Sequence, residues 1–307
     1  MANVHLLKAC TNDAVYDRLK ASYHISFSPR HTLVDSPKQA DIVVFAGSDY
    51  GNLVDIRRHP IFRKYSDNAF VLFEGDWCLP IVPGLYSGLD RWGVIKRWCE
   101  PLHYTKVAFY DDLDSVPDTH PDLLCSFVGR KSTSSVRQQL RDVNDGTCYI
   151  SESPPRETSA YRTAYVEMIG RSRFVLCPRG LGVSSIRLYE TLRSGRVPVI
   201  ISDDWVPPAG PDWASCSVRI PEANAKHAVN VLDSLDTRWP AMSRAARMVY
   251  SDWFSRQSQF DRIIDWCLNL SRGPDRALWP GCIQHLQRLR PSFIKRSVKS
   301  RVGRLLQ

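Results

Sequence analysis

The sequence predicts an α/β protein built from two facing Rossmann-like domains with a cleft between them. Its 307 residues exceed the roughly 100 to 200 usual for one domain. Short apolar runs rich in β-branched residues alternate with helix-like segments, which is typical of a parallel sheet covered on both faces. The alternation restarts after a Pro- and Asp-rich stretch at 111–124, which we interpret as a linker between two such units.

The first domain is expected to span residues 1–118. Its expected elements are, in order, a strand at 4–7, a helix at 12–23 and strands at 41–46 and 69–73. The last of these strands ends in Glu74-Gly75-Asp76-Trp77. Ligands bind beyond the carboxyl ends of the strands in such sheets, so these two carboxylates are candidates for a site in the cleft.

The second domain is expected to span residues 119–275. Its expected strands lie at 124–128, 148–151, 174–177, 197–201 and 218–220, and its helices at about 134–142, 161–170 and 185–194. A further helical stretch at 241–270 is interpreted as a return of the chain toward the first domain. Residues 276–307 are expected to form a separate basic tail.

Composition indicates an ordinary globular protein, with 43% hydrophobic and 24% charged residues. The cysteines number nine, no two form a CxxC pair, and several lie in apolar runs. This favours reduced, mostly buried thiols in a cytoplasmic protein and argues against a zinc site. We see no secretory signal and no apolar run of the roughly 20 residues needed to cross a bilayer.

Much of the net charge of +9 lies in the C-terminal tail. Its basic residues are Arg288, Arg290, Lys295, Arg296, Lys299, Arg301 and Arg304, with apolar residues between them at near-helical spacing. The pattern predicts an amphipathic helix that binds an anionic membrane, which would make the protein peripheral on the inner face of the membrane. The alternatives are a helix packed on the body or a solvated tail. No basic stripe with stacking aromatics recurs elsewhere, so nucleic acid is not an expected partner.

The segment from Arg173 to Glu190 carries the pattern of an anion site. An apolar strand ends at Cys177 and Pro178, a basic loop with two glycines follows, and a helix begins near Ser185. Free backbone N–H groups and the helix dipole favour negative charge at such a turn. Arg179 and Arg187 add guanidinium donors that match phosphate geometry.

Glu190 lies three residues after Arg187, on the same face of this helix. A carboxylate there is suited to accept hydrogen bonds from a ribose diol, as the acidic residue does in dinucleotide sites. The alternative is a simple Arg187–Glu190 pair on an exposed face. The chain contains neither GxxxxGK[ST] nor GxGxxG, so a P-loop kinase or dinucleotide oxidoreductase loses its main support.

These residues and their flanks resemble the exostosin family, glycosyltransferase family 47. The matching positions are Tyr165, Met168, Ser172, Phe174, Leu176, Pro178, Arg179, Gly180, Ser185, Arg187, Glu190, Leu192, Gly195, the run 197–203, Trp205 and Pro208. Upstream, Phe127, Gly129, Arg130 and Arg137 resemble the element that opens the second domain of the family. The similarity covers about residues 124–222.

The resemblance implies the GT-B fold, with a donor nucleotide held by the second domain. It also implies inversion at the anomeric carbon, no obligatory metal and no cofactor. A uridine-diphosphate sugar would be the donor, and a glycan or lipid-linked saccharide the acceptor. The expected donor-binding residues are Arg130, Arg137, Arg179, Gly180, Ser185, Arg187 and Glu190, with Arg179 and Arg187 on the leaving phosphate.

The acceptor hydroxyl needs a base, and a carboxylate at a strand end of the first domain fits that role. Asp76 is the first candidate and Glu74 the second, while Tyr86 is expected along the acceptor path. For Asp76 the alternative is an ordinary turn or N-cap aspartate.

Two other functions stay open at this point. One is a catalytically weak carbohydrate- or nucleotide-binding subunit of a glycosyltransferase complex. The other is a fucosyltransferase-like enzyme with a guanosine-diphosphate donor.

Overall fold

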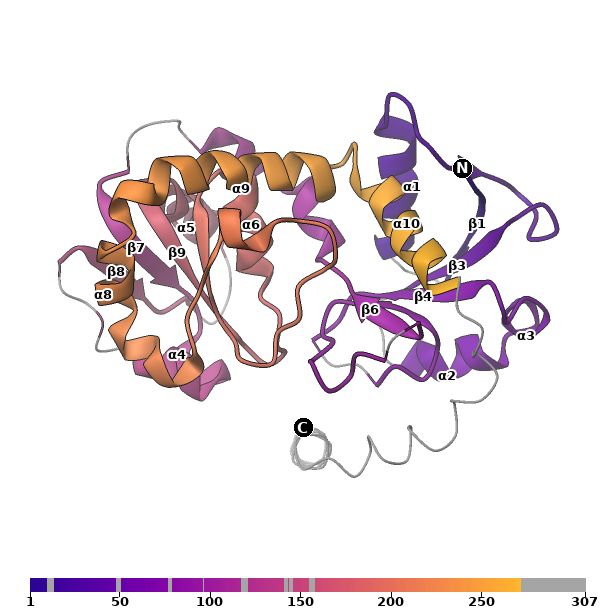
Figure 1. Ribbon diagram of the computed structural model, residues 1–307, viewed down its shortest axis with the longest axis horizontal. Helices are drawn as coiled ribbons and strands as arrows, with labels where there is room; N and C mark the ends of the chain where they lie inside the picture. The colour runs from indigo at the N-terminus through magenta and orange to yellow at the C-terminus, as the bar shows by residue number, and fades with distance from the viewer. Residues whose placement is uncertain are drawn as a thin grey trace.

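The computed structural model describes residues 1–9, 14–47, 51–76, 79–95, 97–116, 121–140, 143, 146–154 and 158–271. They form two α/β domains that lie side by side, each with a parallel sheet between helices (Figure 1). The predicted fold class is therefore confirmed.

The first sheet has six strands in the order β2-β1-β3-β4-β5-β6, and every neighbouring pair is parallel. Its strands are β1 (Asn3–Lys8), β2 (Thr32–Leu33), β3 (Ile42–Gly47), β4 (Ala69–Phe73), β5 (Gly84–Tyr86) and β6 (Cys99–Pro101). Its helices are α1 (Ala14–Ile25), α2 (Gly51–Arg58) and α3 (Pro60–Lys64). The sequence predicted β1, β3 and β4, whose apolar runs are buried; β2, β5 and β6 are two or three residues long and gave no such signal.

The second sheet has five parallel strands in the order β11-β10-β9-β7-β8. Its strands are β7 (Leu123–Val128), β8 (Cys148–Ser151), β9 (Ser172–Pro178), β10 (Val197–Ile201) and β11 (Val218–Arg219). Its helices are α4 (Ser135–Gln139), α5 (Ser159–Arg171), α6 (Ile186–Arg193), α7 (Trp213–Cys216), α8 (Ala228–Asp233) and α9 (Trp239–Trp253). All five strands were predicted, because each is a short apolar run in a parallel sheet buried on both faces.

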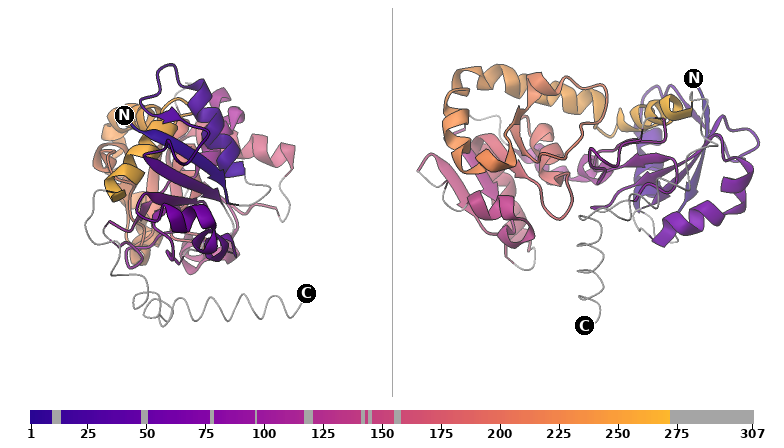
Figure 2. Two further views of the ribbon diagram at one scale, coloured as in Figure 1. Left: turned by 90° about the vertical axis from the view of Figure 1, so that its right-hand side faces the viewer. Right: turned by 60° about the horizontal axis from the view of Figure 1, so that its bottom comes forward.

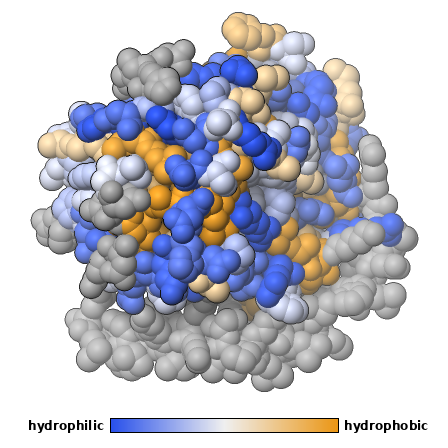
Figure 3. All heavy atoms as spheres, turned by 60° about the vertical axis from the view of Figure 1, so that its left-hand side comes forward, coloured by the Kyte–Doolittle hydropathy of each residue, from blue (hydrophilic) through white to orange (hydrophobic). Residues whose placement is uncertain are grey.

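Helices cover both faces of the second sheet. The cluster that contains Val175 and Cys177 packs α5 and α6 on one face, and the cluster that contains Phe174 and Leu176 packs α4 and α8 on the other. Adjacent residues of β9 thus point to opposite faces, as the strand period of two requires. Figure 3 looks onto this end of the molecule, where a large apolar area is bordered by hydrophilic side chains.

The strand order creates a switch point between β7 and β9. From β7 the chain moves outward to β8, whereas from β9 it moves the other way to β10. Connections that leave in opposite directions open a crevice beyond the carboxyl ends of the two strands, where ligands of such sheets bind. In this domain the crevice lies beyond Val128 and Pro178.

Helix α10 (Gln259–Ser271) returns the chain to the first domain, as Figure 2 shows. It packs against α1, β5 and β6, and the backbone N–H of Arg30 donates to both carboxylate oxygens of Asp261, at 3.1 and 3.0 Å. The return predicted from the sequence is therefore present. By its contacts α10 is part of the first domain, although residues 119–275 were expected to form one unit.

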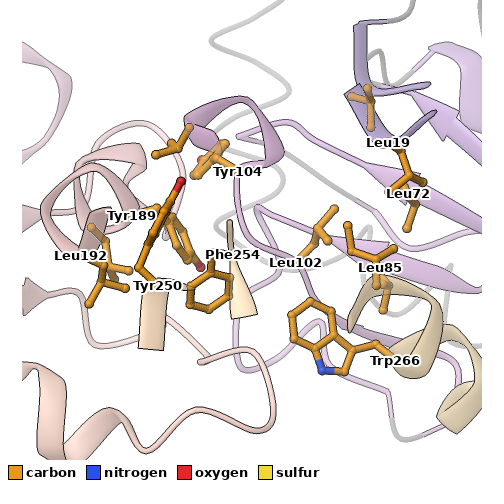
Figure 4. Close-up of a cluster of buried hydrophobic side chains, with 14 of the residues drawn as sticks. Leu19, Leu72, Leu85, Leu102, Tyr104, Tyr189, Leu192, Tyr250, Phe254 and Trp266 are labelled. Carbon is orange, nitrogen blue, oxygen red and sulfur yellow. The ribbon is translucent and has the colours of Figure 1, made fainter. Parts of the chain in front are cut away.

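The two domains share a continuous apolar core. Leu85, Leu102 and Trp266 lie on the first-domain side of this core and Tyr189 and Tyr250 on the other (Figure 4). Phe254, which lies between them, is 1% exposed. Burial of apolar surface by both domains at once holds them in a fixed relation.

A buried hydrogen-bond chain crosses this shared core. Nε2 of His103 lies 3.1 Å from Oε1 of Gln259, whose amide donates to the hydroxyl of Ser22 at 2.7 Å. Burial lowers the pKa of His103 to about 4, so its imidazole is neutral at physiological pH. A neutral, buried imidazole with this partner has a structural role.

The expected linker is fastened to the second domain by ion pairs. Short 3-10 turns, η1 (Thr105–Phe109) and η2 (Asp111–Ser115), open it. Three of its acids pair with arginines: Asp111 with Arg256, Asp112 with Arg162 at 2.5 Å, and Asp114 with Arg193 at 2.7 Å. These acids therefore orient the linker.

Two cysteines differ from the expectation of reduced thiols. Cys125 and Cys148 face each other on β7 and β8 and form a disulfide. Cys99, Cys177, Cys216 and Cys267 are free and buried. Disulfides form in oxidising compartments, so the cysteines no longer support a cytoplasmic location.

Among the described residues no helix is long and apolar enough to cross a membrane. The basic tail, residues 276–307, lies outside the described part of the chain.

Candidate functional site

Two guanidinium groups from opposite faces of the second sheet meet at its switch point. Arg187 extends from α6 on one face and Arg137 from α4 on the other. Both lie over the ring of Phe127 in β7, with the guanidinium carbon of Arg187 at 4.6 Å and that of Arg137 at 5.6 Å from the ring centroid. The sequence predicted both arginines as donor-site residues, and the structure brings them together.

Two glycines leave the room that these groups occupy. A Cβ atom on Gly129 would lie 2.7 Å from Nη2 of Arg187, and one on Gly180 would lie 2.9 Å from Nη2 of Arg137. Both distances are shorter than real Cβ contacts, so a larger residue would push a guanidinium away. Gly180 was predicted as a site residue, and its close approach to Arg137 gives the physical reason.

Neither arginine has an acidic partner within ion-pair distance in the described part of the chain. Arg187 is 7% exposed and donates from Nη2 to the carbonyl of Val128, while its Nε and Nη1 have no partner there. Arg137, half-buried, donates to the carbonyls of Arg179, Arg130 and Pro178, at 3.1, 3.3 and 3.4 Å.

Burial and the neighbouring charge of Arg187 lower the pKa of Arg137 to about 10. Buried charges are normally paired. Two adjacent cations that form no ion pair with a described residue could therefore hold an anion.

The amino end of α6 adds to this positive potential. Ser185 is the N-cap residue, 8% exposed, and its side chain makes no capping hydrogen bond. The first N–H groups of a helix and its dipole favour an anion. Arg130 is exposed directly beyond β7, at the mouth of the same crevice.

The guanidinium group of Arg179 is held in an ion pair and is not a free cation at this crevice. Its Nε donates to both oxygens of Glu222, at 2.8 and 2.9 Å. Glu222, at the start of η5 (Glu222–His227), also accepts from the backbone N–H of Asp203 at 3.2 Å. The expectation of an unpaired Arg179 facing a phosphate is therefore wrong for this structure, because an acid that follows the last strand neutralises it.

Glu190 is likewise engaged inside the protein. It is 3% exposed, and its two oxygens accept from Nη1 of Arg162 at 2.8 Å and from the hydroxyl of Tyr165 at 2.6 Å. Burial and the charge of Glu190 raise the pKa of Tyr165 well above its ordinary value, so this hydroxyl keeps its proton and donates. The predicted ribose contact is not available to these oxygens, and the alternative Arg187–Glu190 pair is not formed either.

The two candidate bases differ in their surroundings. Glu74, 8% exposed, pairs with Arg18 at 2.5 Å and accepts from the hydroxyl of Thr105 at 3.2 Å, so its role is structural. Asp76 is exposed, and its Oδ1 accepts from the hydroxyl of Tyr104 at 3.0 Å.

The backbone of Asp76 touches the loop that precedes α6. A Cβ on Gly182 would lie 2.6 Å from its carbonyl oxygen. The backbone of Asp76 therefore lies against the second domain, while its carboxylate contacts Tyr104.

Tyr86 does not line a path for an acceptor. It is completely buried, and its hydroxyl donates to the carbonyl of Val82. Trp205 is 4% exposed and packs edge-to-face on Trp213, with ring centroids 5.2 Å apart. All three residues contribute to the core.

Sequence reasoning missed several partners that define the site: Phe127 as a platform, Tyr104, Arg162, Tyr165 and Glu222. A signal existed for Glu222, because it comes directly after the last strand and therefore lies at the carboxyl edge of the sheet. None of the described residues form a group of three or more His, Cys, Asp or Glu side chains able to hold a metal.

Glu190→Gln tests the internal role of Glu190. Loss of the charge weakens the bonds to Arg162 and Tyr165, and we expect unfolding free energy to fall by about 1 to 3 kcal/mol. Urea unfolding measures it, with the exposed Glu167→Gln as control. Unchanged stability together with loss of uridine diphosphate binding would instead support the predicted contact between Glu190 and the ribose.

Comparison with known proteins shows which family this part of the chain resembles. Residues 102–235 match the Exostosin GT47 domain, which includes the switch point and both arginines. An Exostosin-1 homolog of Caenorhabditis elegans is 38% identical over 111 residues, 35% of this chain and 29% of the relative. Human ribitol-5-phosphate xylosyltransferase 1 is 33% identical over 85 residues, 25% of this chain and 19% of the relative.

The matched part thus spans less than a third of the length of these curated relatives. A solved α1,3-fucosyltransferase overlaps 89% of this chain and 90% of its own at 12% identity, with a TM-score of 0.44, and the assignment does not depend on it. Residues 102–235 are thus similar to the exostosin family, glycosyltransferase family 47, and the sequence relatives of this part are exostosins and other glycosyltransferases.

Proposed function

We propose that this protein transfers a sugar from a nucleoside-diphosphate sugar to a hydroxyl of a glycan or lipid-linked saccharide, with inversion at the anomeric carbon. We expect a uridine-diphosphate donor and no cofactor besides the substrates. The observation that carries the proposal is the pair Arg137 and Arg187, two adjacent guanidinium groups at the switch point that form no ion pair with any residue the structure describes. The similarity of residues 102–235 to the exostosin domain supports the reaction class.

In this proposal the diphosphate lies between the two arginines and the amino end of α6. Arg187 donates hydrogen bonds from Nε and Nη1 to the phosphate oxygens. Ser185 and Arg130 complete this binding site, which we call the anion seat. Phe127 and the two glycines fix the guanidinium groups before the substrate arrives. Arg179 lies at the rim, with its charge balanced by Glu222.

These cations would act most strongly in the transition state. As the bond from the anomeric carbon to the phosphate oxygen breaks, negative charge grows on the leaving diphosphate. Preorganised donors in a site with little water stabilise such charge more than they stabilise the ground state. The acceptor oxygen forms the new bond on the opposite face, and its proton passes to a base.

Asp76 is the proposed base. It is exposed, belongs to the first domain and touches the loop that leads into α6. The hydroxyl of Tyr104 orients its Oδ1. Burial raises the pKa of Tyr104 well above its ordinary value, and the nearby charge of Asp76 raises it further, so Tyr104 remains a donor at physiological pH.

The basic tail is retained as a proposed contact with an anionic membrane, which would place the protein on the inner face of that membrane. Sedimentation of anionic vesicles with the full chain and with a chain truncated after Pro291 tests it. Equal association of the two forms would exclude this role.

Arg187→Ala tests the anion seat. We expect at least a tenfold loss of uridine diphosphate affinity and a loss of about 10²-fold or more in rate, because a donor to the leaving group is removed. Calorimetry measures the affinity, with guanosine and thymidine diphosphates alongside. The exposed Arg244→Ala is the control. Unchanged affinity in the Arg187 variant would reject the seat, and preference for guanosine diphosphate would reject the uridine donor.

Asp76→Asn tests the base. The amide cannot accept the proton, so we expect the rate to fall by about 10²- to 10⁴-fold while donor affinity is kept. The exposed Asp55→Asn is the control. Retained turnover in the Asp76 variant would remove Asp76 from the mechanism.

A further inference from the structure

Helices α2 and α3 carry a cluster of basic side chains on the surface of the first domain. Arg57 and Arg58 lie in the last turn of α2, Arg63 and Lys64 lie in the last turn of α3, and all four are exposed. The run 57–64 contains these four cations and no acid. Cations gathered in this way give the surface a positive potential.

The apolar side of the two helices determines which side chains face solvent. Leu53, Ile56 and Phe62 belong to the buried cluster on one face of the first sheet. Val54 precedes the two arginines of α2 by three and four residues, so it lies with them on the outer side of this helix, where it is 38% exposed. Burial of the apolar side therefore turns the cations outward, with one apolar residue among them.

The loop that follows β5 covers the same face of the sheet. Leu89 is buried in the cluster that contains Ile56 and Phe62, and Val94 and Ile95 pack against this cluster. In Figure 1, α2 and α3 lie below the first sheet, whereas α1 and α10 lie above it. The loop and the two helices thus form one continuous surface.

This loop adds an exposed aromatic ring and two more cations. Trp92 is 59% exposed, and the guanidinium carbon of Arg91 lies 4.8 Å from the centroid of its ring. Arg97 is exposed as well. An indole ring therefore lies on a surface that is otherwise rich in positive charge.

Contacts with the second domain hold the loop in place. The backbone N–H of Arg91 donates to the carbonyl of Asp204 at 2.9 Å, and Asp90 and Trp205 form an antiparallel bridge. Arg91 also lines an interdomain cavity of about 450 Å³, together with Asp203, Arg219 and Pro221 of the second domain. The basic surface of the first domain therefore ends at the border between the domains.

The mixture of side chains indicates what this surface binds. Cations alone are commonly a solvated surface, and a soluble polyanion would need only the cations. Here Trp92 and Val54 are exposed among them. Tryptophan is enriched at membrane–water interfaces, where its ring lies at the level of the headgroups, and Lys and Arg are attracted to anionic headgroups. The combination favours the surface of an anionic membrane.

We propose that α2, α3 and the side chains of Arg91, Trp92 and Arg97, together called the basic face, dock on the anionic surface of a lipid bilayer. Trp92 and Val54 would lie among the headgroups, with the cations around them. The inference goes beyond the proposed sugar transfer and does not depend on it. It adds a folded surface to the membrane contact proposed for the tail, and the two contacts can be tested apart.

Sedimentation of the full chain with vesicles of phosphatidylcholine, with or without phosphatidylglycerol, tests the basic face. The variant that combines Arg58→Gln, Arg63→Gln and Lys64→Gln removes three of its cations. We expect this variant to bind phosphatidylglycerol vesicles about tenfold or more weakly than wild type, because each cation near an anionic surface adds to the attraction. Binding of the wild type should also weaken as salt is added.

A second triple variant is the matched control. It combines Lys226→Gln, Arg238→Gln and Arg244→Gln, which removes the same charge from exposed positions of the second domain, and it should bind as wild type. Thermal unfolding followed by circular dichroism should be the same in both triple variants and the wild type, which shows that the fold is kept.

Trp92→Ala tests the apolar part of the basic face. We expect binding to phosphatidylglycerol vesicles to fall by about threefold or more, because the indole no longer lies among the headgroups. Phe27→Ala is the control, since Phe27 is 97% exposed and follows α1, which covers the opposite face of the sheet. This control should bind as wild type.

Each other result overturns the proposal. Wild-type binding by the first triple variant, or an equal loss in the control triple variant, would reject the basic face. Loss of all vesicle binding on truncation after Pro291 would assign the contact to the tail alone. Binding of soluble polyglutamate without binding of vesicles would show a soluble polyanion instead of a membrane. No vesicle binding by the wild type would reject the basic face and the tail contact together.

Discussion

The constraint on which this structure depends is a pair of like charges that have no acidic partner in the described part of the chain. Arg137 and Arg187 approach from opposite faces of one sheet and stack on the same ring, that of Phe127. Their carbonyl partners and the space left by Gly129 and Gly180 fix them there, at a free-energy cost that an incoming anion offsets. Strand order explains the location, since a crevice forms where neighbouring strands lead the chain in opposite directions.

The first domain can contribute residues to this site only if its position relative to the second domain is fixed. The shared core around Phe254 and the crossing of the chain in α10 provide that, and the linker acids pair with arginines of the second domain. As a result Asp76 lies against Gly182, and the loop after β5 closes one side of the interdomain cavity. The proposed base thus lies at a strand end that faces the proposed donor seat.

The proposed roles of the residues divide at the boundary of the region that matches the exostosin domain. Residues 102–235, which match the exostosin domain, contain the anion seat and the ion pairs that position it. Asp76, Arg91 and Trp92 precede that region.

The sequence by itself determined the layers, the strands of the second sheet and the arginines of the switch point. Those features depend on local apolar runs and on residues that are close in the chain. The run lengths of a parallel sheet and the spacing of the arginine motif reveal them. Only the tertiary structure decided which residues these side chains pair with. Glu190 meets Arg162 and Arg179 meets Glu222, 28 and 43 residues away, and Cys125 bonds Cys148. Such pairs form only when strand order brings distant segments together, and a spacing read along one helix cannot reveal them.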